Sequence, residues 1–556
     1  MARVDRFKGL VLKPLSNPFI LDGLLWHENT TSKLLMCMGL VEERNPAYVK
    51  KLTDSFVLHW KKPVGQYPDL INFGLRLGSF LSDAGWILES IQILTVVEAK
   101  IRLQGDNELT TTQLVDCLQR RLHCETLIWE FKAGRNTITE ISRLLHTIDF
   151  ENVPEYLAVE IYTRSTAFHL VQHKIEEAYR CSAVIMQYIS ESMPTRILVD
   201  ALRVTAKACM AKRKFGLANL MIQQAISMAA TVFGRNHLIY ADVLFDYAYF
   251  LLLFDKSQHA VNIYDEVCKI RHRKLCDESF LISLTDTAFA NACYVRKHRS
   301  LKLIQNALRV MTKMLPLKNL LLASTFRLHL LIKHQISTDK YERFHKTSYL
   351  EFGMLVKIQI EVVNLCVDIH DDKNLFTAKN YFELARIYQA GKHYQHCKRC
   401  ISKCILITKE GMGSSKKEID DLRVLEAYLE KTNAERNIIQ KVKMEPWFLN
   451  RIETSDRALE QMQPLSARVY GGLTRLYPPN KKFQKFLITL AAKYHSETSC
   501  KHNVDIWSIR FLQHIYFTGA EGVQVWKWQS EQESKLTLDI EPDLESETEE
   551  EATDSD

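Results

Sequence analysis

The sequence has little glycine and proline for its length. Its 556 residues include 19 glycines and 13 prolines, roughly half of the usual share of each. Both residue types interrupt helices, so their scarcity favours a mostly helical fold. The rest of the composition, 46% hydrophobic and 25% charged, is that of a globular protein with enough apolar side chains for a continuous core.

Other features are missing as well. No apolar run reaches the roughly 18 residues of a membrane span, and we read no signal peptide at the N-terminus. The 13 cysteines are scattered and odd in number, which favours a reducing setting over a disulfide framework. Phosphate-binding loops and hydrolase motifs are absent. We therefore expect a cytoplasmic, non-catalytic protein without cofactor or metal, and leave nuclear, microtubule or membrane association open.

Negative charge is concentrated at the C-terminal end. Residues 531–556 hold twelve Asp or Glu and one Lys, a net charge of −11. The whole chain carries +7, which leaves +18 on the other 530 residues. A basic body can hold anionic partners such as nucleic acid, tubulin tails or acidic lipids. A solvated surface with a solubilising tail explains the same asymmetry.

What the sequence does have is a repeated spacing of small residues. A small residue is followed by another after twelve positions, and by apolar or small residues four and seven positions later. The first residues of the five sets are Gly78, Ala206, Ala248, Ala288 and Ala385. Small residues let two helices cross closely, so the pattern predicts helix–turn–helix repeats stacked in a solenoid.

The spacing also sets the expected organisation. The anchors at 206, 248 and 288 lie 42 and 40 residues apart, and each longer interval accommodates two units of about 44 residues. We expect an all-α fold, an α-solenoid of long tetratricopeptide repeats of about 40–44 residues. The expected divisions are a divergent helical segment and linker at 1–69, the solenoid at 70–440, degenerate repeats at 441–528 and a disordered acidic tail at 529–556.

Several segments carry a resemblance to known repeats. The segment 233–275 has an FG-x-x-H turn, a D-Y-x-x-x-L helix and an A-x-x-x-Y helix, and resembles the long tetratricopeptide repeats of kinesin light chains. Over roughly 70–480, the chain resembles the family of amyloid-precursor-protein-binding protein 2. The strings that carry this resemblance are GSFLSDAGW (78–86), VDALRVTAKACMAKRKF (199–215), LLLAS (320–324), TAKNYFELARIYQAGKHY (377–394) and GLTRLY (472–477).

The resemblance implies a non-catalytic adaptor that binds short peptide tails of cargo or substrate proteins, linked to microtubule-based transport and kinesin. An alternative is the substrate receptor of a cullin-2 ubiquitin ligase that binds elongins B and C and reads C-terminal degrons. The nearest elongin-binding candidate, SKLLMCMGLV (32–41), departs from that pattern, because Leu34 precedes Cys37 by three positions and not four. A third hypothesis is a basic protein attached to microtubules or RNA.

The peptide-binding residues are expected on the first helix of each unit, which lines the concave groove. With the small residue counted as position 8, position 6 holds a carboxylate in Asp246, Asp286 and Glu383, and position 9 holds an aromatic ring in Tyr249 and Phe289. Stacked carboxylates beside rings suit a peptide that bears Arg or Lys. The alternative is that these carboxylates pair with the protein's own bases. The further groove candidates are Asp200, Arg203, Lys207, Asp242, Phe245 and Arg386.

One cysteine-rich stretch, HYQHCKRCISKC (393–404), has the composition of a zinc site. However, Cys397 and Cys404 fall on the inward packing positions of the last anchor set. A continuous helix cannot easily direct four such ligands to one ion. We therefore predict core cysteines here and no metal.

Overall fold

The computed structural model describes residues 46–411, apart from short gaps at 61–67, 106, 148–152, 191, 213, 255, 297–299, 342–348, 371–373 and 392. Within these residues the chain forms seventeen helices and no strand. The helices are α4 (Pro46–Trp60), α5 (Pro68–Asp83), α6 (Ile87–Arg102), α7 (Glu108–Leu127), α8 (Phe131–Leu145), α9 (Glu155–Val171), α10 (Ile175–Tyr188), α11 (Thr195–Ala211), α12 (Phe215–Val232), α13 (Leu238–Leu253), α14 (Ser257–Lys274), α15 (Phe280–Val295), α16 (Leu301–Met314), α17 (Leu320–Tyr341), α18 (Tyr349–His370), α19 (Leu375–Ala390) and α20 (Tyr394–Gly411).

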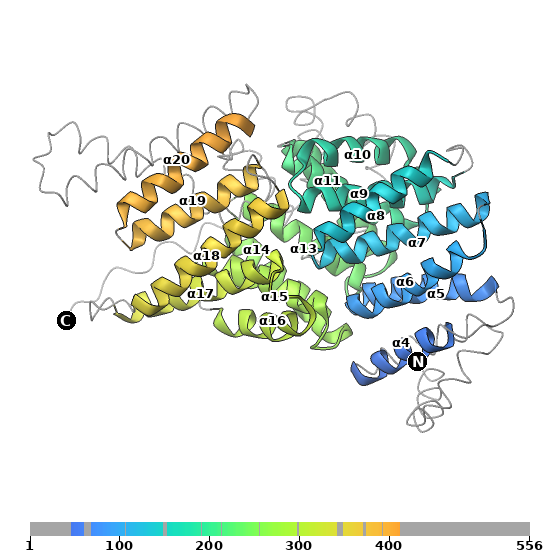
Figure 1. Cartoon of the computed structure of the whole chain (residues 1–556), viewed down its shortest axis with the longest axis horizontal. Coiled ribbons are helices and arrows are strands. Elements are labelled where there is room, and N and C mark those ends of the chain that lie inside the picture. Colours follow the sequence, from blue (N-terminus) through green and yellow to red (C-terminus); the bar gives the residue numbers. More distant parts are fainter. Residues whose placement is uncertain are drawn as a thin grey trace, which may run out of the picture.

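After α4, the helices form eight antiparallel pairs, which we number units 1 to 8 from α5/α6 to α19/α20. The first helix of each unit is called helix A and the second helix B. Each helix A packs on its own helix B, and most B helices pack on the helix A of the next unit. Figure 1 shows the pairs following one another from α5 and α6 in blue to α19 and α20 in orange. The predicted all-α solenoid is thereby confirmed.

Small residues stand where the two helices of a unit cross. In unit 1, the Ser90 hydroxyl donates a hydrogen bond to the Gly78 carbonyl oxygen over 2.6 Å. A Cβ atom on Gly78 would lie 2.7 Å from a methyl group of Leu94, closer than carbon atoms can approach. In units 4, 5 and 8, the predicted small residues at the start of each set are fully buried. The predicted spacing is therefore the spacing of the helix crossings.

Unit 6 departs from the predicted register by two residues. Ala288 is only partly buried, whereas Ala290 is fully buried and its carbonyl oxygen accepts a hydrogen bond from the Ser300 hydroxyl over 3.2 Å. The crossing residue of this unit is therefore Ala290, and the expectation of Ala288 was wrong. The physical reason is the position of the serine: Ser300 immediately precedes α16, ten residues after Ala290, whereas Ser90 lies in the first turn of α6, twelve residues after Gly78.

The array curves back, so that units far apart in sequence share one core. The largest group of buried apolar side chains joins residues of α4 to α9 with residues of α15 to α18. Hydrogen bonds cross the same junction: Ser279 Oγ donates to the carbonyl oxygen of Ala84 over 3.0 Å, and Asn319 Nδ2 to that of Ile128 over 2.8 Å. Units 6 and 7 are thus held against the turns of units 1 and 2.

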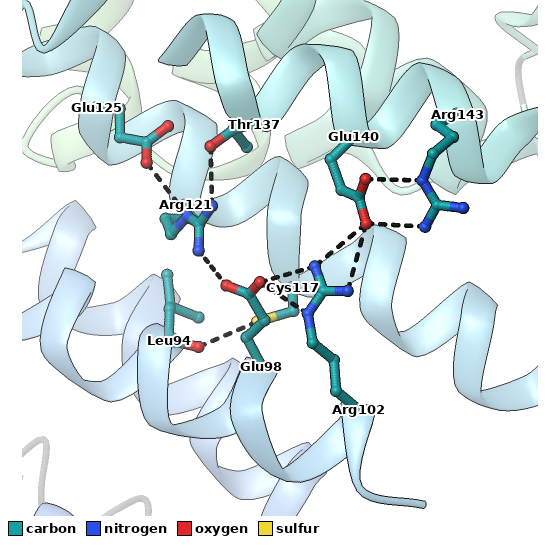
Figure 2. Close-up of polar contacts among 9 residues, drawn as sticks. All are labelled: Leu94, Glu98, Arg102, Cys117, Arg121, Glu125, Thr137, Glu140 and Arg143. Atoms are coloured by element: carbon teal, nitrogen blue, oxygen red, sulfur yellow. Dashed lines mark hydrogen bonds and ion pairs between the residues drawn. The ribbon is translucent and has the colours of Figure 1, made fainter. Parts of the chain in front are cut away.

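Units 1 and 2 are further joined by a network of charged side chains on α6, α7 and α8 (Figure 2). Glu98 accepts hydrogen bonds from Arg102 and Arg121, and Arg121 also donates to Thr137 Oγ1 over 3.0 Å. Beside them the Cys117 thiol donates to the Leu94 carbonyl oxygen over 3.3 Å. Burial raises the pKa of Cys117 above its usual range, so this thiol stays protonated and inert.

Two expectations concern single helices. Cys397 and Cys404 of α20 are fully buried against α19, as the packing positions predicted.

By length and hydropathy, α12 is the one helix of the described residues that could cross a bilayer, although 67% of it is buried inside the fold. It lies in the core of units 4 and 5, where a mostly apolar helix is expected. The segments 32–41, 441–528 and 529–556 lie outside the described residues.

Candidate functional site

Four of the predicted groove residues form one chain of ion pairs on neighbouring A helices. Asp200 of α11 binds Arg164 of α9 over 2.5 Å and also pairs with Arg203. Asp246 of α13 binds Arg203 over 2.8 Å and Lys207 over 3.1 Å, one cation on each carboxylate oxygen. We call the α11–α13 part of this chain the seam. The seam fixes the A helices of units 4 and 5 side by side.

Burial makes the seam an internal feature. The side chain of Asp246 is 5% exposed and those of Arg203 and Lys207 are 17% and 18% exposed. Burial by itself would raise the pKa of Asp200, but the Arg164 and Arg203 guanidiniums lower it below the usual range. Burial lowers the pKa of Lys207, and Asp246 opposes that shift. These pairs match the alternative in which the carboxylates bind the protein's own bases.

Asp242 and Phe245 meet a buried arginine from helix B of their own unit. Arg271 of α14 donates to Asp242 over 2.5 Å and to the Leu281 carbonyl oxygen over 3.0 Å, and its guanidinium lies 5.1 Å from the Phe245 ring centre. Arg271 is 4% exposed. This is the arrangement of carboxylate, ring and cation that was predicted for a bound peptide, with the cation supplied by the chain itself.

Asp286 does not occupy the position of Asp246 because the register of unit 6 is shifted. It lies against α14, where its carboxylate is 3.8 Å from the Cys268 sulfur and 4.0 Å from His272 Nε2. The side chain is 2% exposed, and burial raises its pKa to about 6. In the same unit Phe289 packs on the Tyr264 ring, with 6.5 Å between ring centres.

The other predicted residues lie apart from this group. Tyr249 is partly buried and packs against the core of units 4 and 5. Glu383 of unit 8 is paired within its own helix, 3.5 Å from Arg386. The structure thus brings Asp200, Arg203, Lys207 and Asp246 together, and places Glu383 and Arg386 elsewhere on the array.

A cavity of about 200 Å³ opens at the N-terminal end of the same charged chain. Its walls are the A helices of units 1 to 4, α5, α7, α9 and α11. The titratable or hydrogen-bonding residues that line it are Ser79, Ser82, Asp83, Gln119, Arg120, His123, Glu160, Arg164 and Arg196. We call it the unit 1–4 cavity. Arg164 belongs both to this cavity and to the chain that leads to the seam.

The three guanidiniums of the cavity already have partners. Arg120 binds both oxygens of Asp116, over 2.9 and 3.1 Å, and also donates to Ser79. Arg164 binds Asp200, and Arg196 pairs with Asp83. The positive charge of the cavity is therefore largely compensated before any ligand enters.

Two hydrogen-bond acceptors are left over. Gln119 is 1% exposed and its Oε1 has no partner, while its Nε2 donates to Asp116 over 3.0 Å. Glu160 forms no hydrogen bond or ion pair with another residue in the part of the chain that the structure describes. Burial raises the pKa of Glu160, and Arg164 and Arg120 oppose that shift. One donor, Arg164 Nε, is also unpartnered.

His123 lies in the same wall as an uncharged ring. Burial, and then the neighbouring Arg164, lower its pKa well below the usual value. A neutral imidazole adds no positive charge to the cavity. The electrostatic balance there is consequently set by Glu160 and Asp83 against guanidiniums that are already neutralised.

The groove prediction did not name the residues of this cavity, although charged residues around it recur at an interval of one repeat unit. Asp116 and Glu160 are 44 positions apart, and so are Arg120 and Arg164. Counted forward from Gly78 by 44 positions, unit 2 has Leu122 in the small-residue position, so no anchor marked this unit. A search for charged pairs recurring at one unit length would have found all four.

The fold and the site define the class of this molecule: an α-solenoid of helical hairpins with a charged concave wall. No protein-family model matches the chain. It is similar to the amyloid protein-binding protein 2 of Rattus norvegicus and to that of Mus musculus, in each case 27% identical over 330 residues. The match covers 58% of this chain and 56% of each relative. The chain therefore spans about half the length of the curated relatives it matches.

Proposed function

We propose that the chain is a non-catalytic adaptor that binds a short peptide segment of another protein on the concave wall of its solenoid. The name of its relatives, amyloid protein-binding protein 2, supports a protein-binding role. Repeats of this kind build extended surfaces for partners. The observation that carries the proposal is the unit 1–4 cavity, which is lined by Gln119, whose buried Oε1 has no partner, and by Glu160, a partly buried carboxylate that pairs with no described residue.

The free groups of the cavity define which part of a peptide it would accept. A buried acceptor without a partner costs free energy, about 1–3 kcal/mol, which a ligand donor can recover. Glu160 adds negative charge close to the buried Gln119 oxygen. A lysine ammonium or arginine guanidinium brings both donors and positive charge to these two groups.

This proposal keeps the expectation that acidic and polar groups bind a basic peptide side chain, but it places them on other helices than the sequence predicted. The predicted cation-binding carboxylates Asp246 and Asp242 are engaged with cations of the chain. The leftover acceptors lie two to three units earlier, on α7 and α9. A short linear peptide held in such a groove is expected to bind with micromolar affinity, about −8 kcal/mol.

A display experiment tests the proposal on the full chain. A random 12-residue peptide library is selected on the wild-type protein, and the retained peptides are measured by fluorescence polarisation. We expect enrichment of Lys or Arg at one position, and an affinity loss of at least about 10-fold in Glu160→Gln. Glu155→Gln, an exposed change on the same helix, is the matched control. Selected peptides without a basic residue, or equal binding to both variants, would contradict the assignment of the cavity.

The destination of the bound partner is a separate part of the proposal. We propose delivery to microtubule-based transport, with recruitment to an elongin–cullin ubiquitin ligase as the second candidate. Affinity purification of the chain with and without residues 1–70, followed by mass spectrometry, distinguishes them. Loss of elongin B/C and cullin-2 on truncation would favour the ligase, whereas kinesin or tubulin retained by both forms would favour transport.

A further inference from the structure

The turns between the helices of units 1, 2 and 3 share one backbone feature. Gly85, Trp129 and His173 all have positive φ angles, of 86°, 56° and 58°, and follow one another at intervals of 44 residues. Non-glycine residues rarely adopt this conformation, which costs about 1 kcal/mol or more. Gly85 adopts it without strain, but the strain at Trp129 and His173 indicates that the recurring turn is held by a contact.

That contact is a hydrogen bond from the unit five places further along. In each case the acceptor is the carbonyl oxygen of the residue before the positive-φ position. The donor is the side chain of the residue that immediately precedes an A helix. The three bonds are Ser279 Oγ to Ala84 O at 3.0 Å, Asn319 Nδ2 to Ile128 O at 2.8 Å and Asn374 Nδ2 to Gln172 O at 3.5 Å. We call them rungs one, two and three. Together they fasten units 6, 7 and 8 to units 1, 2 and 3.

Rung three differs from the other two in its chemistry. Its hydrogen bond is the longest, and aromatic rings supplement it. The His173 ring stacks on Phe376 with 3.8 Å between ring centres, and His370 meets His173 edge-on at 5.5 Å. The apolar core of α19 and α20 is separate from the large core that spans rungs one and two. The His173 ring of unit 3 therefore contacts two later units: His370, the last residue of α18 in unit 7, and Phe376 of α19 in unit 8.

The charged groups that face the two histidines are cationic. Arg135 of α8 donates to the Ile369 carbonyl oxygen over 3.3 Å, next to His370. Lys174 adjoins His173, and Lys379 comes from α19. Burial, then Arg135 and Lys174, lower the pKa of His370 to about 4. Burial, then His370 and Lys379, lower that of His173. Asp371 and Asp372 follow in sequence and lie outside the described residues.

We propose that rung three is an acid-sensitive latch: protonation of His173 and His370 repels the two rings from each other and from the neighbouring cations, and separates the turn of unit 3 from the end of α18 and the start of α19. The latch is independent of peptide binding in the unit 1–4 cavity. His370 Nε2 is buried without a hydrogen-bond partner. The Gln172 backbone favours the charged ring, but burial and the neighbouring cations outweigh it.

The direction of the pH dependence follows from the lowered pKa values. The closed state favours the neutral rings, so its stability is intact above about pH 6.5, the ordinary pKa of histidine, and falls as the pH drops towards 4. For His370, with a pKa of about 4 when closed, the equilibrium shifts towards the open state by about ten-fold at pH 5.5. His173, whose pKa is also lowered by burial, shifts the equilibrium in the same direction.

Hydrogen exchange of the full chain at pH 7.5 and 5.5, corrected for the intrinsic rate, measures the latch. We expect protection in segments 170–176 and 374–380 to fall by more than ten-fold, while the segment around Ser90 is unchanged. His173→Asn together with His370→Gln should keep its protection at both pH values; asparagine tolerates the positive φ angle at 173. If that double variant does not fold, His370→Gln alone should make the fall about ten-fold smaller than in the wild type.

The matched control is His329→Gln, because His329 of α17 also has a pKa lowered by burial but lies outside the rungs. It should leave the fall in protection intact. Constant protection of the wild type between the two pH values would overturn the proposal. The proposal would also be overturned if the histidine variants lost as much protection between the two pH values as the wild type does. The same holds if His329→Gln lost none.

Discussion

The seam and the unit 1–4 cavity are built from the same residue types on neighbouring A helices, yet they differ in what is left unsatisfied. In the seam, both oxygens of Asp246 are taken by Arg203 and Lys207. In the cavity, Glu160 and Gln119 Oε1 remain free while the guanidiniums around them are paired. Charge on a concave wall therefore does not identify a binding site by itself. The unsatisfied hydrogen-bonding capacity distinguishes the two regions.

The largest expected effect comes from breaking the seam. In Asp246→Asn, Arg203 and Lys207 lose the charge that compensates them while remaining mostly buried. Breaking one partner of a buried ion pair typically costs several kcal/mol, and because Asp200 still holds Arg203 we expect a loss of about 3 kcal/mol. Urea unfolding measures the loss. An unchanged midpoint would show that the seam is not the internal feature described above.

Much of the fold is predictable because helix crossings depend on local spacing. Gly78 and Ser90 were placed together twelve residues apart, and they form a hydrogen bond. The register of unit 6 was missed because nothing in the composition shows that Ser300 precedes α16 and does not lie within it. The rungs join residues about 190 to 200 positions apart, and no spacing rule reaches that far. They arise from the curvature of the whole array.

The sequence predicted which residue types line the concave wall, but not which of them stay available to bind a partner. Sequence spacing put Asp200, Arg203, Lys207 and Asp246 on one wall, and they do meet. Whether a carboxylate binds a partner or its own neighbour depends on side-chain geometry within a few ångströms, which residue type and spacing do not determine. For that reason the spacing could propose the groove but could not separate the seam from the cavity.

A second prediction uses Asp286, whose partners carry less compensating charge than those of Asp246. Because burial raises its pKa to about 6, this group favours the folded state below the ordinary aspartate pKa, and that contribution is lost as the pH rises from about 4 through 6. Asp286→Asn should therefore stabilise the protein at pH 7.5 by about 1–3 kcal/mol and have little effect near pH 4. Urea unfolding at both pH values measures the difference.

The control for this pH effect is Asp277→Asn. Asp277 also contacts His272, over 3.2 Å, but its side chain is 78% exposed. It should change the unfolding midpoint little at either pH. Equal stabilisation by both variants would assign the effect to His272 and not to burial of Asp286.

A third prediction separates stability from binding in the cavity. Glu160 is a partly buried carboxylate without a direct partner, so removal of its charge in Glu160→Gln should raise the free energy of unfolding at pH 7.5 by up to about 1 kcal/mol. This is opposite in sign to the change expected for Asp246→Asn. A loss of stability as large as that of Asp246→Asn would mean that Glu160 supports the fold in the way that the seam does.

The smallest effect is expected on the exposed edge of the network in Figure 2, where Arg143 pairs with Glu140 over 2.8 Å. The Arg143 side chain is 59% exposed, so solvent screens the pair and Arg143→Ala should cost at most about 0.5 kcal/mol. Its hydrogen bonds help to lower the pKa of Glu140 to about 2, so this contribution is present above about pH 4.5 and is lost as the pH falls towards 2. Unfolding in low and high salt checks the assignment, since a screened pair weakens as salt rises. A cost close to that of Asp246→Asn, unaffected by salt, would show that burial is not what separates strong pairs from weak ones here.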